Sequence, residues 1–267
     1  MKTIDKSDIL FVVLARTRAG VAEKTLELEK LGLSFIVICG EKINRPNVIY
    51  RQSKGKFDAI NFAAKFIDKT VKIVCLNDVD TKLFNFSKAL EAFRRTNEGL
   101  LFCKVRVDSG PQLQFYSLMD KLRRYVPITS SGELMLIQRT VFDKVLPIPP
   151  CKTEDNYISF KVKELGYPVL FCEDCWVETQ RTKTLEEELQ YKTRTVTGLY
   201  QALSFTKPDP LVRVFYLMLP IIAPLLLVQG KRGATWTKGI IHGFTNFLSG
   251  DRAGVFEKIG VQIGRSD

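Results

Sequence analysis

Two aspartates one residue apart, Asp78 and Asp80, follow the apolar run at residues 71–76. A buried strand that ends in acids places carboxylates at the rim of a sheet, where a ligand can reach them. Carboxylate oxygens are the ligands that Mg²⁺ or Mn²⁺ prefers, and such an ion can also hold the phosphates of a substrate. The pair therefore indicates a metal and diphosphate site. A helix cap at Asp78 beside a solvated Asp80 would give the same spacing.

Three further segments carry residues of the same kind of chemistry. Lys54-Gly55-Lys56 precedes a predicted helix start, a place that suits anions, although the spacing of a Walker A loop is absent. Glu154 and Asp155 begin another predicted helix, where acids also serve as caps. Gln190, Arg194 and Gly198 recur at every fourth residue and so share one helix face, from which a guanidinium can clamp phosphate.

The elements that must position these residues form an α/β pattern. Uninterrupted apolar runs of strand length predict buried strands, and longer runs with helical spacing alternate with them. The predicted strands are 9–15, 35–39, 48–50, 71–78, 100–105 and 134–138, and the predicted helices are 19–31, 57–66, 84–95 and 155–165. The β-α-β-α-β order predicts a parallel sheet whose carboxyl-end edge carries Asp78 and Asp80.

The order of these motifs resembles that of the family 2 glycosyltransferases. The matching residues are Gly55-Lys56 with Asn61, then Asp78-Val79-Asp80, Glu154-Asp155 and the Gln190 to Gly198 segment, over roughly residues 8–203. That family contains inverting enzymes of the GT-A fold, among them dolichyl-phosphate sugar synthases. The resemblance implies a GT-A catalytic domain, α/β with a mostly parallel central sheet, at residues 1–206, and a nucleotide-sugar donor.

The resemblance also implies roles for single residues. Asp80, with Asp78, would bind Mg²⁺ or Mn²⁺ on the donor's diphosphate, and Asp155 would be the general base that takes the proton of the acceptor hydroxyl. Lys56 and Arg194 would stabilise the leaving nucleoside diphosphate. The remaining positions that we expect to contact the donor are Arg16, Glu41, Asp78, Glu154 and Gln190.

The sequence departs from the family pattern at three places. Ala15-Arg16-Thr17-Arg18 stands where members usually carry Pro and Asn-Glu. Cys39-Gly40-Glu41 replaces a pair of acids, so Glu41 is the candidate to hold the base or ribose. Arg194 is shifted by one position from the Q-x-x-R-W motif of processive synthases, and no Trp follows it. A single transfer is therefore favoured over polymerisation.

The composition changes sharply after the Lys207-Pro208-Asp209-Pro210 breaker. Residues 211–228 contain one charge, Arg213, and two prolines, and barely reach the roughly 20 residues that cross a bilayer. We expect residues 207–267 to form membrane-associating helices, interfacial or re-entrant at least as readily as spanning. A pair of core helices packed on the catalytic domain is the alternative.

The net charge of the chain bears on the kind of partner that it binds. The 267 residues carry 40 Lys and Arg against 29 Asp and Glu, a formal net charge of +11. This surplus suits an anionic partner such as nucleic acid, phosphate or an acidic membrane surface, and charge alone does not choose among them. No nucleic-acid recognition motif is present. From the apolar segment at residues 211–228 and its flanking basic residues, we expect a location at the cytoplasmic face of a membrane, near a lipid-linked or glycan acceptor. We expect the cysteines, Cys172 and Cys175 included, to be reduced and structural. A nucleotidyltransferase and a catalytically inactive sugar-nucleotide or lipid-binding scaffold remain alternatives.

Overall fold

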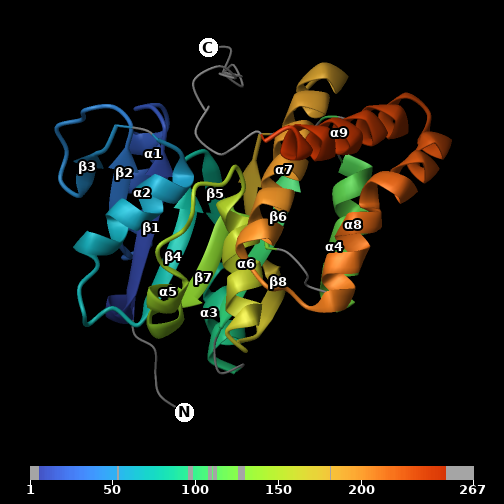
Figure 1. Cartoon of the computed structure of the whole chain (residues 1–267). Helices are drawn as coiled ribbons and strands as arrows, with labels where there is room; N and C mark the ends of the chain where they lie inside the picture. The colour runs from blue at the N-terminus through green and yellow to red at the C-terminus, as the bar shows by residue number, and fades with distance from the viewer. Residues whose placement is uncertain are drawn as a thin grey trace.

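A mixed eight-stranded sheet runs through the computed structural model, with helices on both faces (Figure 1). The structure describes residues 6–52, 54–95, 99–107, 110, 113–125, 130–180 and 182–250. The strand order across the described sheet is β3-β2-β1-β4-β7-β6-β8-β5. The strand direction reverses between the two halves of this order, at the antiparallel β4–β7 pair.

The N-terminal half of the sheet is parallel. A short 3-10 turn at Lys6–Asp8 leads into β1, and the strands are β1 (Ile9–Ala15), β2 (Ser34–Cys39), β3 (Val48–Tyr50) and β4 (Ile73–Asp78). They are connected by α1 (Val21–Lys30) and by α2 (Lys56–Ala63), which a 3-10 turn (Ala64–Phe66) extends. Every residue of β1 is buried, as an apolar run between two neighbours requires. The carboxyl ends of β2, β1 and β4 consequently lie side by side.

The C-terminal half contains both strand directions. Its strands are β5 (Thr81–Phe84), β6 (Leu100–Val107), β7 (Leu134–Gln138) and β8 (Val169–Thr179). β7 is antiparallel to β4 and β6, β8 is parallel to β6, and β5 is antiparallel to β8 at the edge. Because β7 runs backwards, its first residues lie at the same edge as the end of β4.

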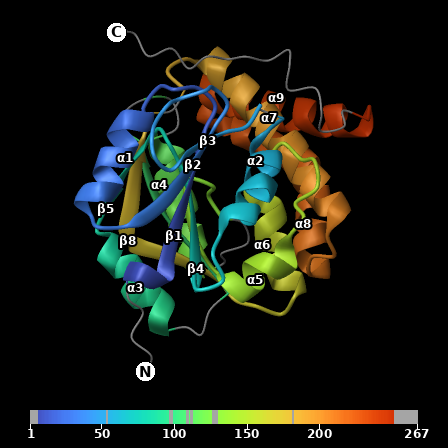
Figure 2. The ribbon, with the colours of Figure 1, turned by 90° about the vertical axis from the view of Figure 1, so that its left-hand side faces the viewer.

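Two apolar cores cover the faces of the sheet. One lies under α2, α5 (Arg139–Val145), α6 (Glu154–Glu164) and α7 (Leu185–Phe205), and the other lies under α1 and α3 (Phe86–Arg95). Helix α4 (Leu113–Tyr125) packs against β6 and β8. Figure 2 shows α1 and α6 on opposite sides of the sheet.

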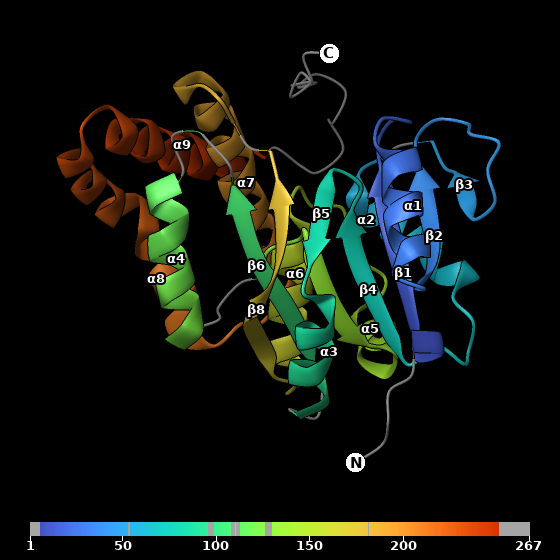
Figure 3. The same cartoon turned by 180° about the vertical axis from the view of Figure 1, so that it is seen from behind.

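The C-terminal segment forms a helical arm beyond α7 (Figure 3). It consists of α8 (Pro210–Ile222), the 3-10 helix η3 (Ala223–Gln229) and α9 (Lys231–Leu248). Pro210–Gln229 is long and apolar enough to cross a membrane, and only 11% of it is buried. The predicted break after α7 is observed, because α7 ends at Phe205. The part of the predicted second helix beyond Gly250 lies outside the described residues.

Several predicted elements differ from the observed ones. Phe84, predicted to begin a helix, belongs to β5, and α3 starts at Phe86. The predicted strand at 134–138 is present but antiparallel. Strand β8 and helices α4 and α5 have no counterpart among the predictions. The mixed α/β class and the strands that carry the candidate site are confirmed.

Candidate functional site

The two predicted metal-binding acids lie in a tight turn, here called the acidic turn (residues 78–81), that joins β4 to β5. Asp78 ends β4, and its side chain is 15% exposed. Asp80 is exposed at the tip of the turn. The Thr81 hydroxyl closes the turn by donating to the Asp78 carbonyl at 2.7 Å. The carboxylates therefore stand at the carboxyl-end edge of the sheet, as predicted.

Helix α1 supports the acidic turn from beneath. The buried Lys24 ammonium donates to the Glu27 carboxylate at 2.6 Å and to the Thr81 hydroxyl at 3.3 Å. Glu27 in turn accepts the Leu83 backbone N–H at 2.7 Å. Burial lowers the pKa of Lys24, while the charges of Glu27, Asp80 and Asp78 oppose that change. A buried ammonium group thus lies beside the turn and supports it through the Thr81 hydroxyl.

Lys56 joins three of the predicted segments. Its ammonium, from the first residue of α2, donates to both Asp78 carboxylate oxygens, at 2.7 and 2.6 Å. The same nitrogen lies 3.7 Å from Glu154 Oε1. Burial alone would lower the pKa of Lys56, but Asp78 and Glu154 outweigh it and raise that pKa. Lys56 is therefore a positive charge held among carboxylates.

Asn61, on the same helix, fixes the loop before α6 by hydrogen bonds to the backbone of Ile148.

The start of α6 presents Glu154 and Asp155 to this lysine. Helix α7 fixes that start in two ways: Gln201 Oε1 accepts the Lys152 N–H at 2.9 Å, and Gly198 lies directly against Thr153. A Cβ on Gly198 would come within 2.6 Å of the Thr153 hydroxyl oxygen. Gly198 therefore permits the close approach of α7 to the start of α6.

Both acids at the start of α6 hold protons more tightly than free acids do. Burial raises the pKa of Glu154 to about 7, against the opposing charge of Lys56. Burial also raises the pKa of Asp155, while Lys56, the Asn156 N–H and Arg194 act in the opposite direction. A carboxylate with a raised pKa is a stronger base, so the environment of Asp155 suits proton abstraction.

The predicted α7 residues lie at the periphery of the cluster. Gln190 and Arg194 are exposed, one turn apart on α7. The positive charge of Arg194 acts on Asp155, which places it near the start of α6. Neither side chain contacts Asp78 or Lys56. The structure thus brings Lys56, Asp78, Glu154 and Asp155 together and leaves Gln190 and Arg194 facing outward beside them.

Arg16 and Glu41 lie on the neighbouring loops after β1 and β2, which the Gly40 N–H to Ala15 carbonyl hydrogen bond ties together. Arg16 is exposed. Glu41 accepts the backbone N–H and the Nε–H of Arg18, at 3.1 and 3.0 Å, and these bonds lower its pKa. The acid that we expected to hold a base or ribose is therefore already engaged by a neighbouring arginine.

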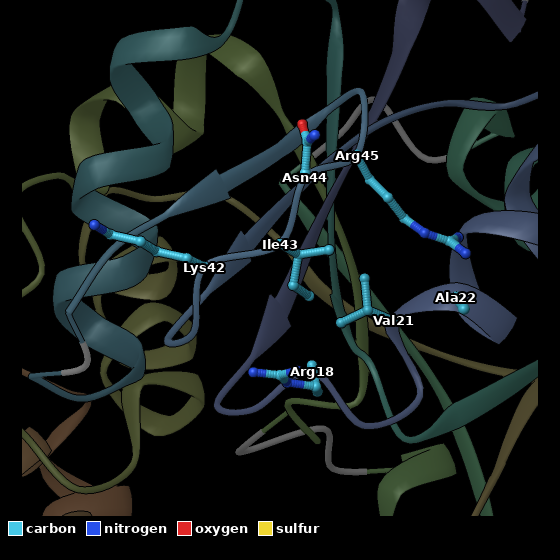
Figure 4. A pocket seen from close by; sticks show the side chains of 7 residues that line it. All are labelled: Arg18, Val21, Ala22, Lys42, Ile43, Asn44 and Arg45. Atoms are coloured by element: carbon cyan, nitrogen blue, oxygen red, sulfur yellow. The ribbon is translucent and has the colours of Figure 1, made fainter.

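A basic hollow of about 290 Å³ adjoins this pair (Figure 4). Figure 4 shows Val21 and Ile43 between Arg18 and Arg45, with Lys42 extending away on the other side. The full lining is Arg18, Val21, Ala22, Lys42, Ile43, Asn44 and Arg45. An apolar floor with a cationic rim suits a flat ligand that carries negative charge.

The side chains of the site can bind a divalent cation only if a substrate supplies further oxygen ligands. Among the described residues, no group of three or more His, Cys, Asp or Glu could hold a metal ion. Asp78 is held by Lys56, and Asp80 is the more exposed of the two carboxylates. Mg²⁺ and Mn²⁺ commonly bind through one or two carboxylates together with substrate phosphates, so these residues fit that arrangement.

Sequence reasoning missed residues whose partners lie far along the chain. Lys24 and Thr81 are 57 residues apart, and Arg18 and Glu41 are 23 residues apart. Charged residues on an amphipathic helix such as α1 are usually solvated, and nothing in the local pattern distinguishes Lys24 from them. The cysteines are free and buried, in agreement with the structural role predicted for Cys172 and Cys175.

Comparisons with known proteins agree with this architecture. Residues 112–198 match the family model described as "Glycosyltransferase like family 2", a range that includes Asp155 and Arg194. No curated protein sequence matches the chain significantly.

Among solved structures, the chain is similar to GalNAc-T7, solved with UDP, GalNAc and Mn²⁺, at 11% identity and a TM-score of 0.54 over 91% of this chain and 56% of that chain. Drosophila β1,4-galactosyltransferase 7, solved with manganese, UDP-Gal and xylobiose, aligns at 14% identity and a TM-score of 0.39 over 61% of this chain and 64% of that chain. The chain therefore spans less than two thirds of either protein.

The first of these alignments covers nearly the whole chain and shows the fold, and the family model covers residues 112–198. Together they show a GT-A fold that contains a glycosyltransferase family 2-like segment.

Proposed function

We propose that the protein is an inverting glycosyltransferase that moves a sugar from a nucleotide-sugar donor to a hydroxyl or phosphate acceptor. One observation carries this proposal: on a GT-A fold, Lys56 links Asp78 to Glu154, and Asp155 follows Glu154 at the same edge of the sheet. Three sequence segments thus meet where open α/β sheets bind ligands. The similar structure of GalNAc-T7 is described with UDP, GalNAc and Mn²⁺, which supports a nucleotide-sugar donor.

The proposed reaction is a single displacement. Asp155 accepts the proton of the acceptor hydroxyl as its oxygen attacks the anomeric carbon. The bond from that carbon to the diphosphate oxygen breaks at the same time, and the bonding electrons leave with the nucleoside diphosphate. Attack from the face opposite the leaving group inverts the configuration. The raised pKa of Asp155 supports its assignment as the base.

The reaction also requires that the negative charge on the leaving group be stabilised. Lys56 supplies an ammonium beside Asp78, and Arg194 supplies a guanidinium at the mouth of the site. When bound through Asp80, a divalent cation supplies Lewis-acid stabilisation of the diphosphate. We place the donor's nucleoside near Arg16, Glu41 and the basic hollow, because these loops adjoin the end of β4.

The acceptor is proposed to be lipid-linked and presented at the cytoplasmic face of a membrane. Helix α7 carries Arg194 on its exposed side and packs against the apolar C-terminal arm on its other side. An acceptor held in a membrane would therefore be close to the site. The net charge of +11 suits the anionic cytoplasmic leaflet.

Release of nucleoside diphosphate tests the transfer reaction. The full-length protein is incubated with Mn²⁺, a polyprenyl phosphate in detergent and a panel of UDP- and GDP-sugars. We expect release with one donor class, and at least about 10²-fold less with Asp155→Asn, which removes the base while keeping the shape. Donor binding by Asp155→Asn should be unchanged in calorimetry.

The matched control is Asp143→Asn, an aspartate on α5 whose side chain is 51% exposed. This variant should keep the wild-type rate. Wild-type protein that binds a sugar nucleotide without releasing diphosphate would instead identify an inactive binding scaffold. An undiminished rate for Asp155→Asn would reduce that residue to a helix cap.

A further inference from the structure

The C-terminal arm carries an apolar surface that a soluble protein does not usually expose. Pro210–Gln229 has a mean hydropathy of 2.3. Large apolar side chains that are 43–80% exposed recur at helical spacing on one side of it, and we name this set the apolar stripe: Leu211, Val214, Phe215, Met218, Ile221 and Leu225. A continuous stripe of this kind marks a surface that binds another apolar phase.

The opposite side of the same segment is fixed to the catalytic domain. Tyr216 is 9% exposed, its ring lies 6.1 Å from that of Phe160, and its carbonyl accepts the Tyr200 hydroxyl at 2.7 Å. Ala223 is buried, and its carbonyl accepts the Thr237 hydroxyl at 2.9 Å. The segment therefore has one side packed on protein and one side open along its length.

The chain reverses at the end of the segment. Gly230 has a φ of 64° and ψ of −140°, a conformation that favours glycine, and α9 begins at the next residue. Helix α9 then packs tightly on α7. A Cβ on Gly243 would lie 2.6 Å from the Val196 Cβ, and the Thr197 hydroxyl donates to the Gly243 carbonyl at 3.1 Å.

This packing determines which side of a membrane α9 can occupy. Helix α7 belongs to the catalytic domain, so α9 must lie on the same side as that domain. A segment that crossed the bilayer between Pro210 and Gln229 would carry α9 to the other side and separate it from α7. Although the segment is long enough to span, its two ends therefore lie on one side.

The charges within and after the stripe are mostly positive. Residues 210–250 contain no Asp or Glu, and their basic residues Arg213, Lys231, Arg232 and Lys238 are all exposed. The acid at the start of the segment, Asp209, caps α8 by accepting the Leu211 N–H at 2.8 Å. An apolar stripe with four exposed cations in or after it matches an anionic lipid surface, in which acyl chains lie beneath negative headgroups.

We propose that α8 and η3 form an in-plane membrane anchor. The apolar stripe lies in the boundary between headgroups and acyl chains of one anionic leaflet, and both ends of the segment remain on the catalytic side. This proposal rests on the membrane association proposed above and specifies its geometry. Flotation tests the association and labelling tests the geometry, so either can fail without the other, and both are independent of the transfer reaction.

Flotation with vesicles measures the attachment. The full-length protein is mixed with vesicles of phosphatidylcholine alone or with about 30% phosphatidylserine and centrifuged through a density gradient. We expect flotation that is stronger with phosphatidylserine. A triple variant within the stripe, Phe215→Glu, Ile221→Glu and Leu225→Glu, should lose at least about tenfold in vesicle affinity, because it replaces three apolar side chains with carboxylates that an anionic leaflet repels.

The matched control changes three exposed apolar residues elsewhere, Leu26→Glu, Leu31→Glu and Phe66→Glu, which are 50%, 38% and 45% exposed. It should float like the wild type. If the wild type does not float but sediments as a dimer that the stripe variant abolishes, the stripe is a contact between two copies and the proposal is wrong. Equal loss of flotation in both triple variants would also overturn it.

Labelling with a membrane-impermeant maleimide measures the topology. Lys207→Cys and Ser249→Cys place exposed thiols before α8 and after α9, while the native cysteines are buried. In inside-out vesicles from cells that produce each full-length variant, we expect equal labelling at both positions before detergent is added. Protection of Ser249→Cys until the vesicles are dissolved would show a span and overturn the in-plane anchor.

Discussion

Asp80 allows metal binding to be tested apart from folding, because its side chain is exposed at the tip of the acidic turn. We predict that Asp80→Ala lowers the Mn²⁺-dependent rate about 10²–10³-fold, the usual effect of losing one charge stabiliser. The free energy of unfolding should change by no more than about 0.5 kcal/mol, as for other surface substitutions. Rates across a Mn²⁺ titration and thermal unfolding measure the two effects.

Asp174→Ala, another exposed aspartate, is the control for this variant and should leave the rate unchanged. The metal role of Asp80 is wrong if the variant keeps full activity. It is also wrong if wild-type protein works undiminished in excess chelator.

Glu154 makes the stability of the fold depend on pH. Its pKa is about 7 in the folded chain against an ordinary value of 4.5, because burial penalises its charge. Between these values the folded state binds more protons than the unfolded state, so the free energy of unfolding falls as the pH rises. In the wild type, the free energy of unfolding should therefore decrease between pH 5 and pH 7.5. We predict that this decrease is about 1–3 kcal/mol smaller in Glu154→Gln.

Urea unfolding at both pH values measures the effect. Glu164→Gln, at the exposed far end of the same helix, serves as the control and should not reduce the fall. An identical pH dependence in Glu154→Gln and wild-type protein would show that the carboxylate is ionised throughout this range.

At the residue scale, the sequence was informative wherever a motif places a charge at the end of an element. Asp78, Lys56 and Glu154 were predicted as parts of separate motifs, and the structure joins them through one ammonium group. The pairs of Lys24 with Thr81 and of Arg18 with Glu41 were not predictable, because such contacts arise from packing and leave no spacing signal. The catalytic and binding roles assigned to all of these site residues, Arg16 and Gln190 included, stay predictions.

At the element scale, α7 holds the start of α6 through a glycine contact. Gly198 has no room for a side chain, since an added Cβ would meet the Thr153 hydroxyl oxygen at 2.6 Å and its backbone nitrogen at 2.7 Å. We predict that Gly198→Ala costs about 1–3 kcal/mol of stability, as overpacking does, and lowers the transfer rate by moving Asp155. Chemical denaturation and steady-state kinetics measure both effects.

The double variant of Gly198→Ala with Thr153→Ala should recover part of the loss, because it removes the hydroxyl and methyl groups but not the backbone nitrogen. Thr235→Ala, on the exposed side of α9, is the control for an alanine placed in a helix. No recovery in the double variant, with Gly198→Ala as stable as the wild type, would contradict a tight contact here.

The predicted elements that the structure confirms are those with long apolar runs, such as β1 and β4. Strand β5 has four residues, lies at the edge of the sheet and pairs with β8, which is distant in the sequence, so the local sequence favoured a helix start there. Strand β8 has an irregular register opposite Cys103 and Lys104, which disrupts the alternation of buried and exposed residues. The direction of β7 was not predictable, because a buried apolar run reads the same in parallel and antiparallel pairs.

At the scale of the whole molecule, the sequence left two alternatives open for the C-terminal arm: membrane-associating helices, or core helices packed on the domain. The arm has features of both. The apolar stripe of α8 and η3 is exposed, as expected for a membrane-associating segment. Helix α9 is instead packed on the domain: the Tyr200 ring lies 4.9 Å from that of Phe244 and 5.7 Å from that of Phe247. Trp236, also on α9, is 8% exposed, and the Lys192 ammonium lies 3.4 Å from the centroid of its ring.

The packing of α9 on α7 predicts what happens when the C-terminal arm is removed. A chain that ends at Thr206 would expose the α7 surface that α9 covers, including Tyr200 and Val196. We predict that it aggregates or unfolds at lower temperature than the full-length protein. The triple stripe variant, which keeps α9 in place, should be monomeric without detergent.

Size-exclusion chromatography with light scattering, together with thermal unfolding, compares the two proteins. A truncated chain that is monomeric and as stable as the full-length protein would show that residues 1–206 form an independent domain. In that case α9 would contribute no stability to the catalytic half.

Helix α7 contacts the start of α6 through Gly198 and contacts α9 through Val196 and Thr197. One helix therefore sets the distance between Asp155, the proposed base, and the proposed membrane anchor. On the proposed arrangement, the site stands at a fixed height above the headgroups, and an acceptor must extend its reactive oxygen to that height. The enzyme would then select acceptors by reach as well as by chemistry, and discriminate against those whose reactive oxygen ends too close to the lipid.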